Sequence, residues 1–176
     1  FLDYPFSTLK SDFMDLFLIK KCHFFIGSNT GLDCIAIIFR KPLLCLNMLP
    51  ISLFYLFKKK ILITPKILFR RNKKLRLSQI FNLDIQNCST SKCYRKKKIS
   101  IKELSYSQIN NCLNEFIKME KNNWKLNKKE KKVQEKFRKI YLDFIGKEQL
   151  DYTKVLNKNN ILGYVSNNYI EKNNWC

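Results

Sequence analysis

The chain has 176 residues, of which 45% are hydrophobic and 14% are aromatic, and this composition excludes an intrinsically disordered protein. The formal net charge of +20 favours anionic partners such as nucleic acid, acidic lipid or nucleotide-linked substrates. The charge is uneven, because residues 1–57 carry +1 and the remaining residues carry +19. Lys and Asn are abundant along the whole chain, which favours solvated basic faces over one dedicated binding patch.

Signals for export, membrane insertion and metal binding are weak. The first residues lack a signal peptide, and the longest apolar stretch, residues 43–57, is shorter than the roughly 20 residues of a membrane-spanning helix. The seven cysteines are an odd number, which fits reduced thiols in the cytoplasm. Cys88 and Cys93 have the spacing of half a zinc site, but no second pair or nearby His completes it, so we expect no metal. Because patterned sequence begins at Phe1, we expect this chain to be part of a longer protein.

The N-terminal residues predict a helix followed by a parallel βαβ unit. Ser11 is a good N-cap for the first helix, and Asp12 and Asp15 favour its first turn. The remaining elements follow from short apolar runs separated by polar loops. In chain order we expect a loop over 1–10, a helix over 12–20, a strand over 24–26, a small polar loop over 27–31, a helix over 32–39, a turn at Arg40-Lys41-Pro42 and a strand over 43–47.

The middle of the chain predicts shorter and more polar elements. The apolar run over 61–63 predicts a further parallel strand that Thr64-Pro65 ends. Ser78 is a plausible cap for the short helix near it. The other expected elements are a short helix over 51–60, a basic linker after Pro65, a short helix over 78–83, a polar loop over 84–98 and an extended segment over 98–102.

Two amphipathic helices are the clearest signals in the C-terminal half. Ser105 and Gln108 form a capping-box pattern, and apolar residues follow at helical spacing as far as Ile117. A basic helix over 128–145 has Phe137 and Tyr141 on one face. Gly146 ends this second helix.

The alternation of strands and helices predicts an α/β fold with a Rossmann-like parallel sheet and flanking helices, followed by a helical C-terminal extension. The expected organisation is a Rossmann-like domain over 1–120, a basic amphipathic helix over 121–146 and an Asn-rich, loosely ordered tail over 147–176.

The polar loop between the first strand and its helix is the candidate binding site. Its glycines allow positive φ and close backbone approach, and the N–H groups of the first helical turn are free to hold a phosphate. In doubly wound sheets, ligands bind at this carboxyl end of the strands. The start of the preceding helix would face the same crevice and supply a cation. The candidate residues are Gly27, Ser28, Asn29, Thr30, Gly31, Lys10 and Ser11.

Other polar residues suggest no catalytic centre. The loop matches neither the Walker pattern nor G-x-G-x-x-G, so taken alone it fits a structural turn as well as a phosphate site. His23, the only histidine, precedes the strand at the opposite end from the loop and is interpreted as structural. Asp33 lies in the first helical turn, where the helix dipole explains it. There is no Asp-x-Asp metal motif and no nucleophile elbow, and the catalytic residues stay unknown.

The order of these signals resembles the C-terminal, donor-binding domain of GT-B glycosyltransferases. It is most similar to bacterial glycosyltransferases associated with surface-polysaccharide genes, and more distantly similar to heptosyltransferases and fucosyltransferase-like enzymes. In those families a strand ends in Gly-Ser/Asp-x-Ser/Thr-Gly before a helix, a Lys-Pro turn and another strand. The resemblance covers about residues 3–83 and weakens through 105–120. The segment that carries it reads YPFSTLKSDFMDLFLIKKCHFFIGSNTGLDCIAIIFRKPLLCLNMLP.

The resemblance implies that this chain binds a nucleotide-sugar donor, with the loop near the donor phosphates. It implies transfer to a glycan or lipid-linked acceptor, without a bound metal or cofactor, in the cytoplasm and in part at the inner face of the membrane. The catalytic base would come from a domain outside this chain, so the fragment alone would be inactive. Ser28 and Asn29 stand where related loops often carry an acidic residue, and this leaves the donor type open.

Three alternatives stay open at this point. A nucleotide-sugar epimerase shares the architecture and a phosphate loop. A nucleic-acid-binding protein would use the basic clusters over 92–98 and 121–139, but few aromatic residues are interleaved with them, so nucleic acid is the weaker alternative. A basic surface on acidic lipid is compatible with the glycosyltransferase hypothesis.

Overall fold

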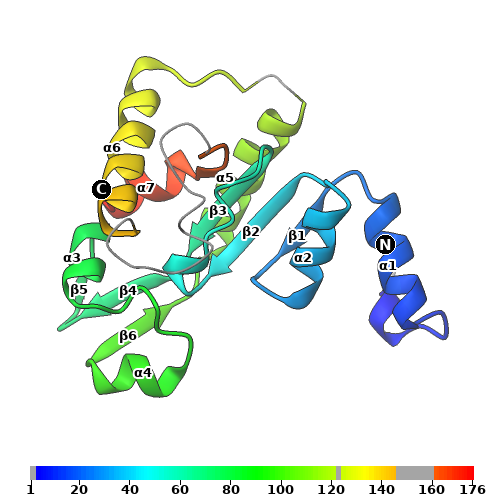
Figure 1. The fold of residues 1–176 in the computed structure, drawn as a ribbon, viewed down its shortest axis with the longest axis horizontal. Coiled ribbons are helices and arrows are strands. Elements are labelled where there is room, and N and C mark those ends of the chain that lie inside the picture. The colour runs from blue at the N-terminus through cyan, green and yellow to red at the C-terminus, as the bar shows by residue number, and fades with distance from the viewer. Residues whose placement is uncertain (1–2, 122–123, 146–160) are drawn as a thin grey trace.

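The computed structural model describes residues 3–121, 124–145 and 161–176, and these form an α/β fold around a four-stranded parallel sheet (Figure 1). The strand order is β1-β2-β3-β7. The prediction of an α/β fold with a parallel sheet and flanking helices is confirmed. The strands are β1 (Phe25–Gly27), β2 (Leu43–Met48), β3 (Ile61–Pro65) and β7 (Tyr164–Val165).

The expected N-terminal βαβ unit is present. Helix α1 (Asp12–Lys21) begins at Ser11, whose Oγ accepts a hydrogen bond from Met14 N at 3.2 Å. Strand β1, helix α2 (Gly31–Ile38) and strand β2 follow, and β1 pairs with β2 in parallel register. A 3₁₀ turn, η1 (Tyr4–Phe6), precedes α1.

Side chains that alternate along the strands divide the core between the two faces of the sheet. On one face, Leu44 and Leu62 pack with Phe116 and Met119 of α5 (Tyr106–Glu120). Ser105 and Gln108 form the expected capping box at the start of α5, because Ser105 N donates to Gln108 Oε1 at 2.9 Å. The sequence pattern of α5 therefore predicted both where the helix begins and which face is buried.

The basic helix α6 (Lys128–Ile145) contributes to the core on the opposite face of the sheet, where it contacts α3 (Leu77–Asn82) and α7 (Asn167–Asn173). Phe137 and Tyr141 of this helix are fully buried with Leu43 and Ile63 of the sheet. The hydroxyl of Tyr141 donates to Ile51 O at 3.2 Å. The amphipathic helix is confirmed, but it is part of the main core and not an appendage to a finished domain.

The C-terminal residues differ from the expected loose tail. Residues 161–176 add strand β7 to the sheet beside β3 and then form α7 (Asn167–Asn173), and Ser166 Oγ caps this helix by accepting from Tyr169 N. Trp175 is only 2% exposed, and its ring lies 6.0 Å from that of Phe137. Burial of several apolar side chains outweighs the Asn-rich composition here. The rest of the expected tail, 147–160, lies outside the described residues.

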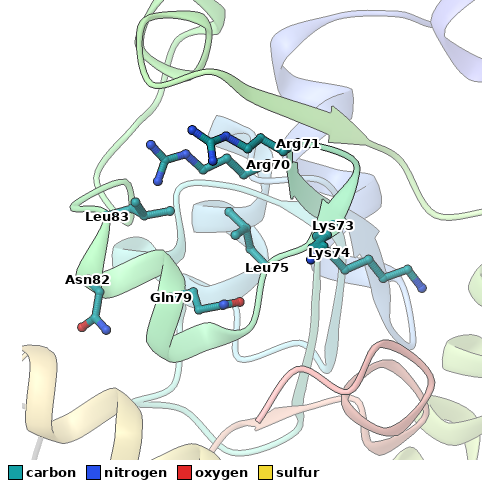
Figure 2. A pocket seen from close by; sticks show the side chains of 8 residues that line it. All are labelled: Arg70, Arg71, Lys73, Lys74, Leu75, Gln79, Asn82 and Leu83. Atoms are coloured by element: carbon teal, nitrogen blue, oxygen red, sulfur yellow. The ribbon is translucent and has the colours of Figure 1, made fainter.

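The prediction of a basic linker after β3 is wrong. The segment contributes to a second, antiparallel sheet with the strand order β5-β4-β6. Its strands are β4 (Ile67–Arg70), β5 (Lys73–Lys74) and β6 (Ile99–Lys102). Arg71 and Asn72 turn the β4–β5 hairpin, with φ of 49° and 60° (Figure 2). Two consecutive residues with positive φ are typical of a type I′ turn. The extended segment expected near 98–102 is confirmed as β6.

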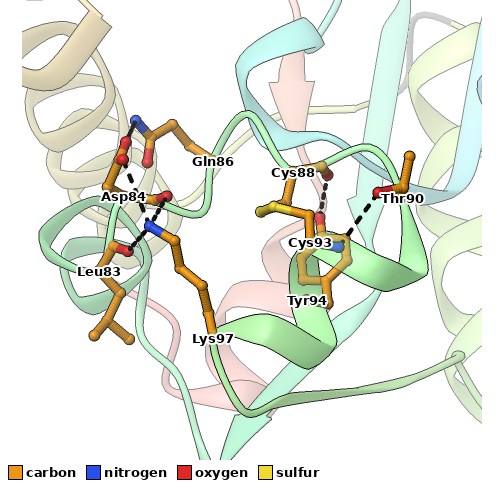
Figure 3. Close-up of a disulfide and its surroundings, with 8 residues drawn as sticks. All are labelled: Leu83, Asp84, Gln86, Cys88, Thr90, Cys93, Tyr94 and Lys97. Carbon is orange, nitrogen blue, oxygen red and sulfur yellow. Dashed lines mark hydrogen bonds and ion pairs between the residues drawn. A yellow bond between two sulfur atoms is a disulfide. The ribbon is translucent and has the colours of Figure 1, made fainter.

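The expected polar loop over 84–98 contains a helix and a disulfide (Figure 3). Thr90 caps α4 (Ser91–Lys96), because its Oγ1 accepts from Cys93 N at 3.3 Å. Cys88 is bonded to Cys93, so the expectation of reduced thiols is wrong for this pair, while the other five cysteines are free. The hydroxyl of Tyr94 donates to Cys88 O at 2.5 Å and closes the turn.

Two short helices also differ from the prediction. The expected helix over 51–60 is reduced to the 3₁₀ turn η2 (Ile51–Leu53), which follows a cis Leu49–Pro50 peptide bond. The helix expected near 78–83 is present as α3 (Leu77–Asn82). Arg76, and not Ser78, is its N-cap, and Arg76 N donates to Gln79 Oε1 at 2.9 Å.

Candidate functional site

The candidate loop over 27–31 lies where the sequence places it, between β1 and the start of α2. It follows the carboxyl end of a strand in a parallel sheet, the end at which ligands bind in open α/β sheets. Helices α1 and α2 contact each other, and both begin at this end of the sheet (Figure 1). The fold therefore brings the two predicted halves of the site to the same edge.

The glycines of the loop have a different role from the expected one. No described glycine has positive φ, and the left-handed residue of the loop is Asn29, with φ of 66°. Gly27 is required by packing, because a Cβ at this position would lie 1.9 Å from Asp33 Oδ1. At Gly31 a Cβ would meet nothing within 4 Å, so the start of α2 faces open space.

Asp33 organises the loop from within. Its side chain is fully buried, and its Oδ2 accepts hydrogen bonds from Asn29 N at 2.6 Å and Thr30 N at 3.1 Å. These two N–H groups are therefore bonded internally, and Thr30 N is among those expected to hold a phosphate. The explanation of Asp33 by the helix dipole alone is incomplete, because its carboxylate also bonds the backbone at the start of the helix. The spacing Thr30-x-x-Asp33 fits a capping-box pattern and was the available sequence signal.

The thiol of Cys45 completes the surroundings of the Asp33 carboxylate. Cys45 Sγ lies 3.8 Å from Asp33 Oδ2, and the residue is fully buried. Burial, and secondarily the nearby carboxylate, raises the pKa of the Cys45 thiol well above its usual range. The sulfur thus keeps its proton and serves as a donor to Asp33.

The side chain of Asn29 attaches the loop to the segment that follows β2. Its Nδ2 donates to Leu49 O at 2.6 Å, and its Oδ1 accepts from the Tyr55 hydroxyl at 2.8 Å. Burial raises the pKa of Tyr55 above its usual range, so the phenol remains a donor. Asn29 is consequently a structural residue whose amide is already used.

The groups still available to a ligand are at the outer rim of the loop. Within the described part of the chain, the N–H groups of Gly31 and Leu32 have no hydrogen-bond acceptor, as is usual for a first helical turn. Ser28 is exposed, whereas the Thr30 hydroxyl donates to Asp33 Oδ1 at 3.4 Å. The positive end of the α2 dipole adds to these donors.

Lys10 and Ser11 lie at the start of α1, and their expected contribution to ligand binding stays a prediction. Ser11 Oγ caps α1, and Ser11 N donates to the Tyr4 hydroxyl at 3.2 Å. Lys10 is exposed. Among the described residues, no hydrogen bond links either one to the loop over 27–31.

The described ranges contain neither a metal-binding cluster nor a membrane-spanning helix. No cluster of three or more His, Cys, Asp or Glu side chains there is arranged to hold a metal ion. None of the helices in those ranges is long and apolar enough to cross a membrane.

Comparisons with known proteins do not assign this chain to a family. No protein-family model matches it, and neither the curated proteins nor the solved structures contain a significant match.

Proposed function

We propose that this chain is the donor-binding half of a GT-B glycosyltransferase, which transfers a sugar from a nucleotide-sugar to a surface-glycan or lipid-linked acceptor. The single observation that carries the proposal is the open start of α2 at the carboxyl end of β1. A helix start with free N–H groups favours a phosphate, and a diphosphate is what nucleotide-sugars share. The resemblance of residues 3–83 to donor-binding domains supports the same interpretation.

In this proposal the loop binds the donor diphosphate through its outer rim. The N–H groups of Gly31 and Leu32 and the hydroxyl of Ser28 donate to phosphate oxygens. Asp33 does not contact the donor. It holds Asn29 and Thr30 in the conformation that aims the outer donors into solvent.

The same groups would stabilise the departing nucleotide. When the glycosidic bond to the diphosphate breaks, negative charge develops on the leaving oxygen. The α2 dipole, the rim N–H groups and Lys10 at the start of α1 would stabilise that charge without a metal. We place the acceptor and its base on a domain outside this chain, and the enzyme in the cytoplasm beside the inner face of the membrane, where basic surfaces bind acidic lipids.

Substitutions at the rim test the proposal because they keep the backbone hydrogen bonds of Asn29 and Thr30 to Asp33. Thr30→Trp removes only the Thr30 Oγ1 bond to Asp33, which is long at 3.4 Å. Thr30→Trp and Gly31→Leu each fill the space in front of α2, and the backbone N–H of Thr30 is kept. Ser107→Trp is the matched control, since Ser107 is exposed in the first turn of α5.

The measurement is a thermal-shift screen of nucleotide-sugars, followed by titration calorimetry with the best one. We expect both rim variants to abolish binding and the control to bind as the wild type does. Unchanged affinity in the rim variants would refute the assignment of the loop. If the longer protein epimerised the donor without an acceptor, the transferase assignment would be wrong even though the loop bound it.

A further inference from the structure

We propose that a second pocket, between the β4–β5 hairpin and α3, binds the phosphate group of an anionic ligand through Arg70 and Arg71 (Figure 2). The ligand is a small phosphorylated molecule or a phosphorylated lipid headgroup. The pocket shares no residue with the loop over 27–31, and the inference does not depend on the proposed glycosyltransferase function. Its volume is about 450 Å³, and it is lined by Arg70, Arg71, Lys73, Lys74, Leu75, Gln79, Asn82 and Leu83.

The hairpin places two arginines at the cavity, whereas the side chain of Lys74 extends in the opposite direction (Figure 2). Arg70 and Lys73 are opposite each other in the β4–β5 pair, and Arg71 lies in the turn between them. In Figure 2 the side chains of Arg70 and Arg71 extend in the same direction, toward Leu83. Two guanidinium groups are therefore presented from one end of the hairpin to one ligand.

The positive charge of the pocket is not neutralised by the protein. Four of the eight lining residues are cationic and none is acidic. In the ranges that the structure describes, the ion pairs lie elsewhere and involve Lys66, Lys97 and Lys129, and no carboxylate pairs with Arg70 or Arg71. Like charges that face each other across a strand pair are destabilising, and a bound anion would remove this repulsion.

The remaining walls suit a phosphate with a small substituent. Gln79 Oε1 accepts from Arg76 N, so the amide NH₂ of Gln79 is left as a donor. Lys74 Nζ is held by Asn173 Oδ1 at 3.2 Å, which fixes one side of the hairpin. Buried Leu75 contributes apolar surface to the lining. Planar guanidinium groups match phosphate oxygens by paired hydrogen bonds, which makes arginine the favoured residue for such a site.

The lining favours phosphate recognition over binding of nucleic acid. Proteins that bind single-stranded nucleic acid combine basic grooves with aromatic side chains on which bases stack. None of the eight lining residues is aromatic. The chemistry of the pocket thus recognises the phosphate and not a base.

The test compares a hairpin variant with a control of equal charge. Arg70→Gln combined with Arg71→Asn removes both guanidinium groups, and Asn is well tolerated at the left-handed position 71. Lys131→Gln combined with Lys132→Gln removes two exposed charges from α6. Arg70→Lys combined with Arg71→Lys keeps the charge but loses the paired hydrogen bonds. Melting temperatures confirm that each variant is folded.

Each protein is titrated with inorganic pyrophosphate by calorimetry, and separately with phosphatidylcholine vesicles that contain phosphatidic acid. We expect the hairpin variant to bind at least one of the two probes with an affinity at least about tenfold lower than that of the wild type. The lysine variant should have an intermediate affinity, and the affinity of the control should change less than about twofold. Loss for pyrophosphate assigns a soluble phosphorylated ligand, and loss for the vesicles alone assigns a lipid headgroup.

Three results would overturn the inference: no binding of either probe by the wild type, equal loss in the control, or an RNA oligonucleotide that binds tightly and is not displaced by pyrophosphate. Thr30→Trp separates the two proposed sites. It should abolish nucleotide-sugar binding, but the hairpin substitutions should still lower the affinity for the phosphate probes by the same factor.

Discussion

Replacing Gly27 by alanine should destabilise the protein through a residue six positions away. The new Cβ would lie 1.9 Å from Asp33 Oδ1, so the carboxylate must move. The movement breaks its hydrogen bonds to Asn29 N and Thr30 N, at 2.6 and 3.1 Å. A hydrogen bond to a charged group contributes about 1.5–3 kcal/mol, so we expect Gly27→Ala to lower the free energy of unfolding by about 3 kcal/mol.

A double-mutant cycle with Asp33→Ala identifies the cause. Asp33→Ala removes the same two hydrogen bonds, together with the longer ones from Thr30 Oγ1 at 3.4 Å and Cys45 Sγ at 3.8 Å, and should cost at least as much as Gly27→Ala. Once the carboxylate is absent, the Cβ of residue 27 has room, so the double variant should cost about 3 kcal/mol and not about twice that figure. Gly31→Ala is the control, because a Cβ there meets nothing within 4 Å, and we expect it to be neutral or slightly stabilising.

The assay is urea unfolding followed by tryptophan fluorescence and circular dichroism. The free energies of unfolding are compared at equal m-values, so that a change in the denatured state is not read as a change in stability. Additive costs of Gly27→Ala and Asp33→Ala would refute the reasoning, because they would show that the two substitutions act on different contacts. A neutral Gly27→Ala variant would refute it as well.

The remaining predictions concern the packing of the core and the dependence of stability on pH in alkaline solution. Phe116→Asp places a charge on the fully buried face of α5, and we expect a loss of more than about 3 kcal/mol in the urea assay; an unchanged melting temperature would contradict the packing of α5 on the sheet. Trp175→Ala should cost about 3–5 kcal/mol, whereas a loosely ordered C-terminus would make it neutral. Burial raises the pKa of the Cys112 thiol from 9.0 to about 11. Unfolding therefore releases a proton between these values and stability falls as pH rises through them, so Cys112→Ala should show a shallower decline in unfolding experiments over that range.

The elements that could be predicted from the sequence are those decided by neighbours in the chain. Ser11 and Ser105 cap the helices that follow them, and these hydrogen bonds span three residues. The apolar spacing of α6 likewise predicted its buried Phe137 and Tyr141. The βαβ unit was predictable because a short apolar run, a polar loop and an apolar helix succeed one another within about one supersecondary unit.

The elements that were missed depend on contacts between distant residues or on unusual backbone geometry. The β4–β5 hairpin has Arg71 at a left-handed position and lysines in its second strand, and neither residue type predicts a hairpin. Residues 161–176 were expected to be loosely ordered apart from docking of a few apolar side chains, but Val165 pairs beside Ile63, about a hundred positions earlier in the chain. Such a strand is stabilised by the sheet edge it joins.

The sequence by itself determined that this protein is an α/β fold with a polar loop before a helix, because strand and helix periodicities and capping patterns act over a few residues. Only the tertiary structure decided what the loop can offer a ligand. It buries Asp33 against Gly27, uses the inner N–H groups internally and leaves the rim at Gly31 open. It also brought the two arginines of the hairpin to one pocket. Both outcomes depend on which side chains fill the space between elements, and that is settled by packing and not by local pattern.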